Sequence, residues 1–275
     1  IRLPRIILAF LIGGGLAIAG AAFQGMFGNP LVSPDILGVS AGAGFGASLG
    51  ILITGHGFAA QVMALLFGLG AIIFTYVISG IKKSAPIFML VLAGVVTSAL
   101  FNALISLTKF VADPEEKLPA ITYWLMGSLG TATYKDVYIA GPIIVVGILI
   151  LYALRWRINL LTLPEDEAKS LGISVTRLKW TVIFGATLIT AASVAVAGIV
   201  GWVGLIIPHI ARMIVGNNNQ LVLPVSVSIG GAYLLIIDNL ARSITATEIP
   251  LSILTAIIGA PFFAILLRKT GGGWS

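Results

Sequence analysis

The sequence has no cysteine, only two histidines and few charged residues, and each shortage excludes a class of protein. Without cysteine there can be no disulfide, no thiol catalysis and no cysteine-based metal site. The two histidines, His56 and His209, cannot form a metal cluster alone. Charged residues make up 9% of the chain and form no exposed basic domain. We therefore expect no metal site and no nucleic-acid partner.

Motifs of ATP hydrolysis and of common enzymes are also missing. The chain has no Gly-x-x-x-x-Gly-Lys-Ser/Thr phosphate loop, no His-Glu-x-x-His pair and no aspartate-rich site for prenyl diphosphates. We expect no catalytic residue and no cofactor in this chain. If the protein moves a substrate uphill, the energy must come either from ATP hydrolysis by a partner or from an ion gradient.

What the chain has in excess is apolar surface. Hydrophobic residues make up 58% of it and the mean hydropathy is +1.09, more than the core of a soluble domain could bury. A helix that crosses roughly 30 Å of hydrocarbon needs about 20 apolar residues and satisfies its own backbone groups. The sequence therefore predicts an all-α, polytopic bundle of transmembrane helices, in one domain over residues 1–275.

Eight apolar runs are long enough to span a membrane: 6–27, 36–53, 58–79, 87–107, 138–154, 181–196, 222–240 and 251–267. Two shorter runs, 118–129 and 201–215, are expected to be broken or re-entrant helices. Gly198, Gly201 and Gly204, followed by Pro208, favour a break at the second of them.

Residues 155–179, called the charged segment below, hold eight of the 26 charged side chains of the protein. Thr162 precedes Glu165 by three residues as in a capping box, Pro164 falls in the first turn, and Gly172 can end a helix. This pattern predicts a short ordered helix between two spans. It is the place where a soluble partner could bind.

The basic residues suggest an orientation. If the charged segment is cytoplasmic, ten lysines and arginines lie inside, namely Lys82, Lys83, Arg155, Arg157, Lys169, Arg177, Lys179, Arg212, Arg268 and Lys269. Six then lie outside, namely Arg2, Arg5, Lys109, Lys117, Lys135 and Arg242. The excess favours this orientation, because positive charge collects on the cytoplasmic side.

Charges near the ends of two spans allow several roles. Asp238 and Arg242 lie one helical turn apart and are expected to pair with each other. Alternatively, Arg242 faces a partner together with Arg2 and Arg5. Glu248 stands at the start of the last span, where an acid suits the amino end of a helix.

Two further patterns lie between residues 29 and 50. Gly38, Gly42, Gly46 and Gly50 place a glycine on one helix face every four residues, which allows close helix packing; a subunit interface or a pore lining is the alternative. Asn29, Pro30 and Leu31, with Pro34 behind them, interrupt the apolar pattern. They form either a constriction at the inner end of a pathway or a tight turn.

Several segments together resemble a known family. They are RLPR (2–5), GAAFQ (20–24), NPL (29–31), LGVSAGA (37–43), YWLMGS (123–128), GWVGLIIPHIAR (201–212), DNLAR (238–242), EIP (248–250) and GAPFF (259–263). In this order and over nearly the whole chain, they are similar to the permease subunits of FecCD-type ABC importers. Members of that family carry cobalamin, haem, ferric siderophores and some oxyanions.

The resemblance implies a fold and a set of partners. The family has ten spans, so about nine are expected in this chain, with the first lying ahead of Arg2. It implies a homodimer in the cell membrane, with two ATPase subunits on the cytoplasmic side and a binding protein outside. ATP and magnesium would then be bound by the ATPase subunits and not by this chain.

The resemblance also assigns roles to residues. It implies a coupling helix, which sits in a groove of the ATPase, at Leu163, Pro164, Glu165, Asp166, Glu167, Ala168, Lys169, Ser170, Leu171 and Gly172. Arg2, Arg5 and Arg242 match arginines that receive acidic residues of the binding protein. Asn29, Pro30 and Leu31 match the inner gate. A second gate segment of some members has small hydroxyl residues, whereas this chain has Pro86, Ile87 and Phe88, so that role is not transferred.

The alternative is a gradient-driven secondary transporter, for which Asp238 is the candidate proton-binding residue. A structural or receptor membrane protein is a third class. Uptake that depends on ATP or on a proton gradient separates the first two, and the absence of uptake under both conditions favours the third.

Overall fold

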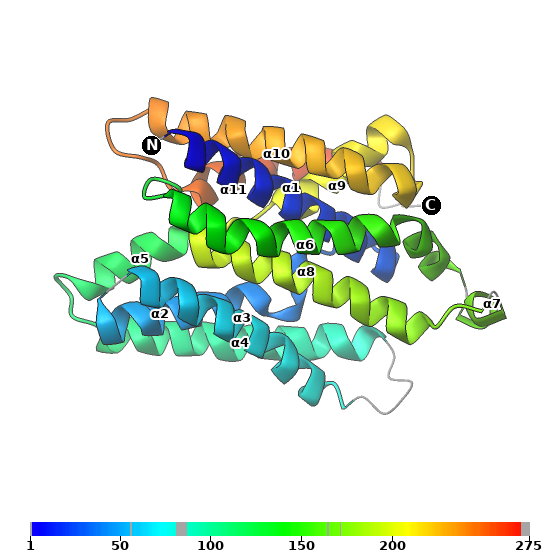
Figure 1. Ribbon diagram of the computed structural model, residues 1–275, viewed down its shortest axis with the longest axis horizontal. Helices are drawn as coiled ribbons and strands as arrows, with labels where there is room; N and C mark the ends of the chain where they lie inside the picture. The colour runs from blue at the N-terminus through cyan, green and yellow to red at the C-terminus, as the bar shows by residue number, and fades with distance from the viewer. Residues whose placement is uncertain (1, 56, 81–86, 164, 171, 271–275) are drawn as a thin grey trace.

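The computed structural model describes residues 2–55, 57–80, 87–163, 165–170 and 172–270. Its elements are α1 (Arg2–Phe27), η1 (Pro34–Leu37), α2 (Val39–Thr54), α3 (Gly57–Ile78), α4 (Ile87–Val111), α5 (Lys117–Met126), α6 (Tyr134–Ile158), η2 (Asn159–Thr162), α7 (Glu165–Ser170), α8 (Val175–Ala197), α9 (Val203–Val215), α10 (Asn219–Ser243) and α11 (Leu251–Thr270). Within these described ranges all regular elements are helical, so the all-α prediction is confirmed. The long helices lie roughly along one direction in a single bundle (Figure 1).

The predicted spans correspond to helices of the structure. Among the described residues, six helices are long and apolar enough to cross a membrane, namely α1, α3, α4, α6, α8 and α10, and α2, α9 and α11 are shorter apolar helices. The run 118–129 is α5, whose ten residues are too few to cross the bilayer. The run 201–215 is α9, which is separated from α8 by an irregular stretch, as expected from its glycines.

Local backbone chemistry sets the helix ends that matter for the candidate sites. At the start of α6, Asp136 accepts hydrogen bonds from the backbone and hydroxyl of Thr133, at 2.8 and 2.7 Å. Between α8 and α9 the chain passes through two left-handed residues, Gly198 and Trp202, with φ of +70° and +69°. A tryptophan in this region is uncommon, and it marks the break between the two helices as a constrained joint.

Helices α1 and α8 form the centre of the bundle. In their most apolar windows 78% and 72% of the residues are buried, against 22% in α3. Close packing of α1 depends on glycine: a Cβ added to Gly13 would overlap the backbone of Gly230 on α10, and one added to Gly20 would overlap Gly204 on α9. Small residues let helices approach closely in lipid, where hydrophobic attraction between helices is weak.

The bundle has two ends (Figure 1). The Arg2 end contains the amino terminus of α1, the last turn of α10 and the loops next to α5; the α7 end contains α7 and the α9–α10 turn. The described basic residues sort as the sequence predicts, with Arg2 and Arg242 at one end and Arg155 and Arg177 at the other. Lys82, Lys83 and Pro86 lie outside the described residues.

Candidate functional site

At the α7 end, the charged segment forms a short helix that is anchored at one face. Ala168 is 1% exposed, and its carbonyl oxygen accepts a hydrogen bond from the backbone N of Ile173 at 3.4 Å. Gly172 has a φ of +77°, the left-handed conformation that commonly ends a helix. Glu167 and Ser170 are exposed. The helix that the sequence predicts is present as α7, between Glu165 and Ser170.

Parts of the prediction for this segment cannot be placed. Pro164 and Leu171 lie outside the described residues, and so do the side chains of Thr162 and Glu165, on which the capping box depends. Leu163 is 37% exposed.

The charged segment is connected to α10 through asparagines. The side-chain amide nitrogen of Asn159 donates to the side-chain oxygen of Asn218 at 2.8 Å. The side-chain oxygen of Asn159 accepts from the backbone N of Asn219 at 2.9 Å. Asn218 in turn caps α10 by accepting from the backbone of Gln220 at 3.0 Å. The base of the charged segment is therefore attached to the start of α10, so the two can move together.

The predicted gate residues form a turn after α1. Gly28 has a φ of +59°, and the side chain of Asn29 accepts from the backbone N of Leu31 at 2.9 Å. Asn29 and Leu31 are exposed, whereas Pro30 is half-buried. The turn and a constriction are compatible, because the exposed side chains of the turn lie at the end of the central helix.

Gln24 is a residue near this turn whose importance sequence reasoning missed. It is 2% exposed, and its amide donates to the carbonyl oxygens of Val32 at 3.3 Å and Leu205 at 3.2 Å. Its own oxygen accepts from the guanidinium of Arg212. Gln24 thus joins α1, the turn and α9. A polar residue inside an apolar run was the signal that could have revealed it.

At the Arg2 end, three residues that are distant in sequence form an ionic cluster. Nε of Arg5 donates to both carboxylate oxygens of Asp238 at 2.9 Å, and one Nη donates to the same carboxylate at 2.8 Å. The other Nη donates to Glu248 at 2.6 Å. The side chains of Arg5 and Asp238 are only 11% and 4% exposed, whereas that of Glu248 is 32% exposed.

This cluster corrects three sequence predictions. Asp238 pairs with Arg5, on another helix, and not with Arg242, which binds Asn239 on its own helix. Glu248 binds Arg5 instead of acting at the amino end of α11. Arg5 does not face outward, because its guanidinium forms ion pairs with two carboxylates inside the bundle. Of the three arginines of the docking prediction, Arg2 and Arg242 are exposed.

The glycine face of α2 lies against α3. A Cβ on Gly42 would lie 2.7 Å from the carbonyl oxygen of Phe67, and one on Gly46 would overlap that of Met63. A Cβ on Gly50 would lie 2.8 Å from the Cα of Ala60. Gly38 differs, because it has a φ of +82° and caps η1 and α2. The structure therefore places three of the four glycines in helix packing within one chain.

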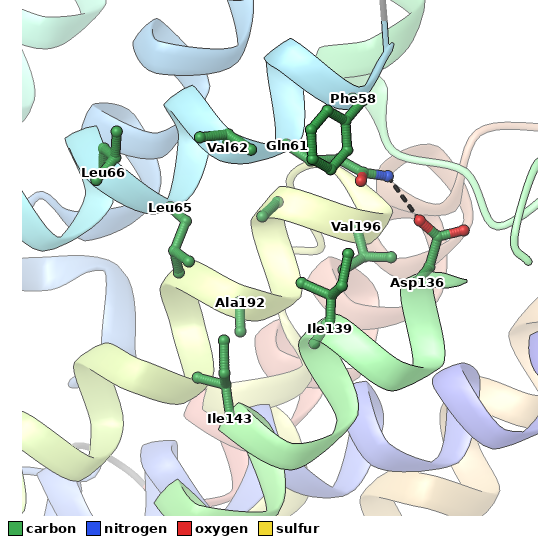
Figure 2. Close-up of a pocket in the computed structure, with 12 residues that line it drawn as sticks. Phe58, Gln61, Val62, Leu65, Leu66, Asp136, Ile139, Ile143, Ala192 and Val196 are labelled. Carbon is green, nitrogen blue, oxygen red and sulfur yellow. Dashed lines mark hydrogen bonds between the residues drawn. The ribbon is translucent and has the colours of Figure 1, made fainter. Parts of the chain in front are cut away.

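A small cavity lies between α3, α6 and α8 (Figure 2). Leu65, Ile139 and Ala192 are among its apolar walls, and Gln61 closes one side by donating to Asp136 at 2.8 Å. Its volume is about 110 Å³, whereas sites for drug-sized ligands usually measure about 300–1,000 Å³. Both oxygens of Asp136 are already hydrogen-bonded. The cavity is too small and too apolar to hold a chelate.

A larger cavity of about 580 Å³ lies between α3 and α8. Its lining contains only apolar and aromatic side chains and two hydroxyls, those of Tyr76 and Thr187; the rings of Tyr76 and Trp180 pack edge to face with centroids 4.9 Å apart. With no charged group in its lining, this cavity has nothing to orient a charged cargo.

Comparison with known proteins gives a consistent result. The family described as the FecCD transport family matches residues 1–269. The molybdate import system permease protein MolB of Haemophilus influenzae is 44% identical over 273 residues, which cover 99% of this chain and 81% of that protein. The cobalamin import system permease protein BtuC of Halobacterium salinarum is 42% identical over 269 residues, which cover 98% of this chain and 72% of that protein.

The fold agrees with a solved structure described as an inward-facing conformation of a metal-chelate type ABC transporter. The TM-score is 0.93 at 45% identity, and the match covers 98% of this chain and 86% of that chain. The family match and these relatives extend over both ends of the bundle, from Arg2 through the charged segment to α11. The chain therefore belongs to the FecCD transport family, and it is a multi-pass membrane permease of the ABC-importer type.

Proposed function

We propose that this permease moves a metal chelate or an oxyanion inward by alternating access, driven by ATP hydrolysis on partner subunits. The observation that supports this most is the pair of chemically different ends on one transmembrane bundle: exposed arginines at the Arg2 end and a short anchored helix at the α7 end. The names of relatives include molybdate, iron chelatin, cobalamin and hemin as cargo, so the cargo class is broad.

In this proposal α7 is the site at which the ATPase subunits act. Its Glu167 and Ser170 are exposed and its Ala168 is buried, α7 lies against η2 and α8, and Asn159 of η2 is bonded to the start of α10. A push on α7 would therefore reach the transmembrane helices through packed atoms. The α7 end is then cytoplasmic, and ATP and magnesium are bound by the ATPase subunits and not by this chain, which acts without catalysis of its own.

The Arg2 end is the proposed surface for an extracytoplasmic binding protein. Arg2 and Arg242 are exposed there on neighbouring helices, so acidic residues of a partner can reach them. Arg5 supports this surface from inside, because its pairing with Asp238 fixes α1 against α10.

A second copy of the chain completes the pathway in this proposal. The two cavities described above are either too small or too uniformly apolar for a charged cargo, which favours a pathway between copies over one inside a single chain. The whole of residues 1–275 then acts as one permease domain.

The gradient-driven alternative has less support than the sequence suggested. Its candidate residue, Asp238, receives three hydrogen bonds from Arg5, and this buried pair gives Asp238 a structural role in holding α10 against α1.

Proteoliposomes that contain the permease, its cognate ATPase and its cognate binding protein test the proposal. We would supply labelled ferric siderophore, cobalamin, haemin and molybdate separately. We expect ATP-dependent accumulation of at least one of them, and only with the binding protein present. Accumulation that is indifferent to ATP and to the binding protein would contradict the proposal.

A further inference from the structure

The proposed docking surface is joined directly to the buried ionic cluster. Arg2 lies one helical turn before Arg5 on α1, and Arg242 lies one turn after Asp238 on α10. The two helices that carry the exposed arginines are therefore locked together by the Arg5–Asp238 ion pair. A partner that binds Arg2 or Arg242 therefore acts on the two helices that the guanidinium of Arg5 joins.

Glu248 extends this cluster toward another part of the fold. One of its oxygens accepts from Arg5 at 2.6 Å, and the other lies 2.6 Å from the position that a Cβ added to Gly130 would take. Gly130 is not among the glycines with positive φ, so a Cβ there would not strain the backbone but would have to displace the end of the Glu248 side chain. The carboxylate of Glu248 thus fills the gap between Arg5 and the turn that precedes α6.

That turn, residues 127–130, holds three helices together. The carbonyl oxygen of Gly127 accepts from the backbone N of Leu251, the first residue of α11, at 2.9 Å. The backbone N of Ser128 donates to Ala197, the last residue of α8, at 3.0 Å. The turn itself follows α5. A displacement of Glu248 that moves this turn would therefore reach the ends of α5, α8 and α11.

The two carboxylates that share Arg5 are not equivalent. Asp238 is almost fully buried and alone can neutralise the guanidinium, whereas the side chain of Glu248 is about one-third exposed. Releasing a partly exposed carboxylate into water costs much less than uncovering a buried one. Added negative charge at Arg2 and Arg242 weakens the net attraction that holds Glu248, because it acts on Arg5 and Glu248 with opposite sign.

We propose that Glu248 is a positioning residue, which transmits docking of the binding protein at Arg2 and Arg242 to turn 127–130 and the first turn of α11. This inference rests on the proposed docking function. Docking loosens the Arg5–Glu248 contact while Arg5–Asp238 remains, and the turn then shifts with Glu248. In this proposal Arg2 and Arg242 bind the binding protein, whereas Glu248 carries the response to it.

Glu248→Gln tests the proposal, because it keeps the shape of the side chain and removes its charge. In proteoliposomes with ATPase and binding protein, we would measure the Kd of docking and, separately, the increase in ATP hydrolysis that the binding protein causes. We expect the Kd to change less than about twofold and the increase to change by about fivefold or more, the lower range of typical coupling between sites. Glu115→Gln, an exposed glutamate in the α4–α5 loop at the same end, is the matched control and should leave both unchanged.

Gly130→Ala supplies a second test that does not alter the charge. Its Cβ displaces the Glu248 carboxylate, so it should reproduce the effect of Glu248→Gln on stimulation. In a Glu248→Ala background the carboxylate is gone and only the hydroxyl of Ser128, 3.2 Å from the added Cβ, stays close, so Gly130→Ala should have little further effect.

The outcomes separate the two proposals. If the unaltered complex neither binds the binding protein nor responds to it, the proposed function fails. If it does both and the Glu248 and Gly130 variants match it, the positioning role of Glu248 is wrong. If docking and stimulation weaken in proportion, Glu248 belongs to the docking surface and its positioning role is wrong. Additive effects of Gly130→Ala and Glu248→Ala would also overturn that role.

Discussion

The two ends of the bundle handle charge in opposite ways. At the Arg2 end, Arg5, Asp238 and Glu248 come from three separate segments; Arg5 pairs with both carboxylates, and Arg5 and Asp238 are shielded from water. At the α7 end, the charged segment keeps Glu167 in solvent and attaches to the bundle through Ala168 and neutral asparagines. One end is held by ions, the other by packing and amide hydrogen bonds.

The difference indicates which end can change its contacts. A buried ion pair is strongly destabilised when one partner is removed, so the arrangement of α1 and α10 at the Arg2 end is fixed and leaves Arg2 and Arg242 for a partner. The α7 end loses little free energy when a surface contact is broken, because exposed polar groups can bond to water instead of to protein. This suits a segment that a separate subunit pushes and releases.

Removing the buried arginine should have the largest effect. Arg5→Met leaves Asp238 buried without a counter-ion, and we expect a loss of about 3–5 kcal/mol in the free energy of unfolding. Arg242→Met, at an exposed arginine of the same end, should cost less than about 1 kcal/mol. Denaturant unfolding of the detergent-solubilised protein measures both. Equal losses for the two variants would remove the contrast between buried and exposed arginines.

A packing change between the two ends gives a reference without charge. Gly46→Leu inserts a side chain where the backbone of Met63 on α3 already lies, and we expect it to cost about 1–3 kcal/mol of unfolding free energy. Gly70→Leu on α3 meets nothing within 4 Å at its Cβ and serves as the control. The same unfolding assay applies. A Gly46 variant as stable as the Gly70 variant would mean that α2 and α3 pack less closely than described.

A charge reversal on α7 should act on coupling and not on stability. Glu167 is exposed, so Glu167→Arg should leave the free energy of unfolding within about 0.5 kcal/mol of that of the unaltered protein. We expect it to lower the amount of cargo moved per ATP hydrolysed by about fivefold. Glu115→Arg, at the other end, should not change this ratio. Ala168 is unsuitable for this test, because it is buried and a charge there would disturb the helix itself.

Charge reversal of the exposed arginines should give the smallest effect on free energy. Arg2→Glu and Arg242→Glu should each weaken docking of the binding protein by about 0.2–1 kcal/mol, up to roughly fivefold in Kd. The loss should grow as salt is lowered, because the screening length rises from about 10 Å at 0.1 M to about 30 Å at 0.01 M. Lys109→Glu is the control at the same end. Docking that ignores both arginine changes at low salt would leave them as membrane anchors only.

Features that depend on neighbours in sequence could be predicted. The apolar runs gave the spans, and α9, residues 203–215, begins within two residues of the predicted start. The starts of α6 and α8 were placed too late, at 138 and 181 instead of 134 and 175. Their first turns contain polar residues, a capping box in α6 and Arg177 in α8, which lower the hydropathy of the window.

Features that depend on the bundle could not be predicted. Arg5 and Asp238 are 233 positions apart, and the rule for residues one turn apart favoured Arg242 as the partner of Asp238. The bond of Gln24 to Arg212 crosses 188 positions in the same way. A sequence shows that such buried polar residues need partners, but only the packing of α1 against α9 and α10 selects them.

The energy source tests the account most directly. We would measure the initial rate of cargo uptake into proteoliposomes that contain the permease with its ATPase and binding protein, once with ATP and no ion gradient and once with a proton gradient and no ATP. The account predicts uptake with ATP alone and none with the gradient alone. Uptake that follows the proton gradient and ignores ATP would contradict it.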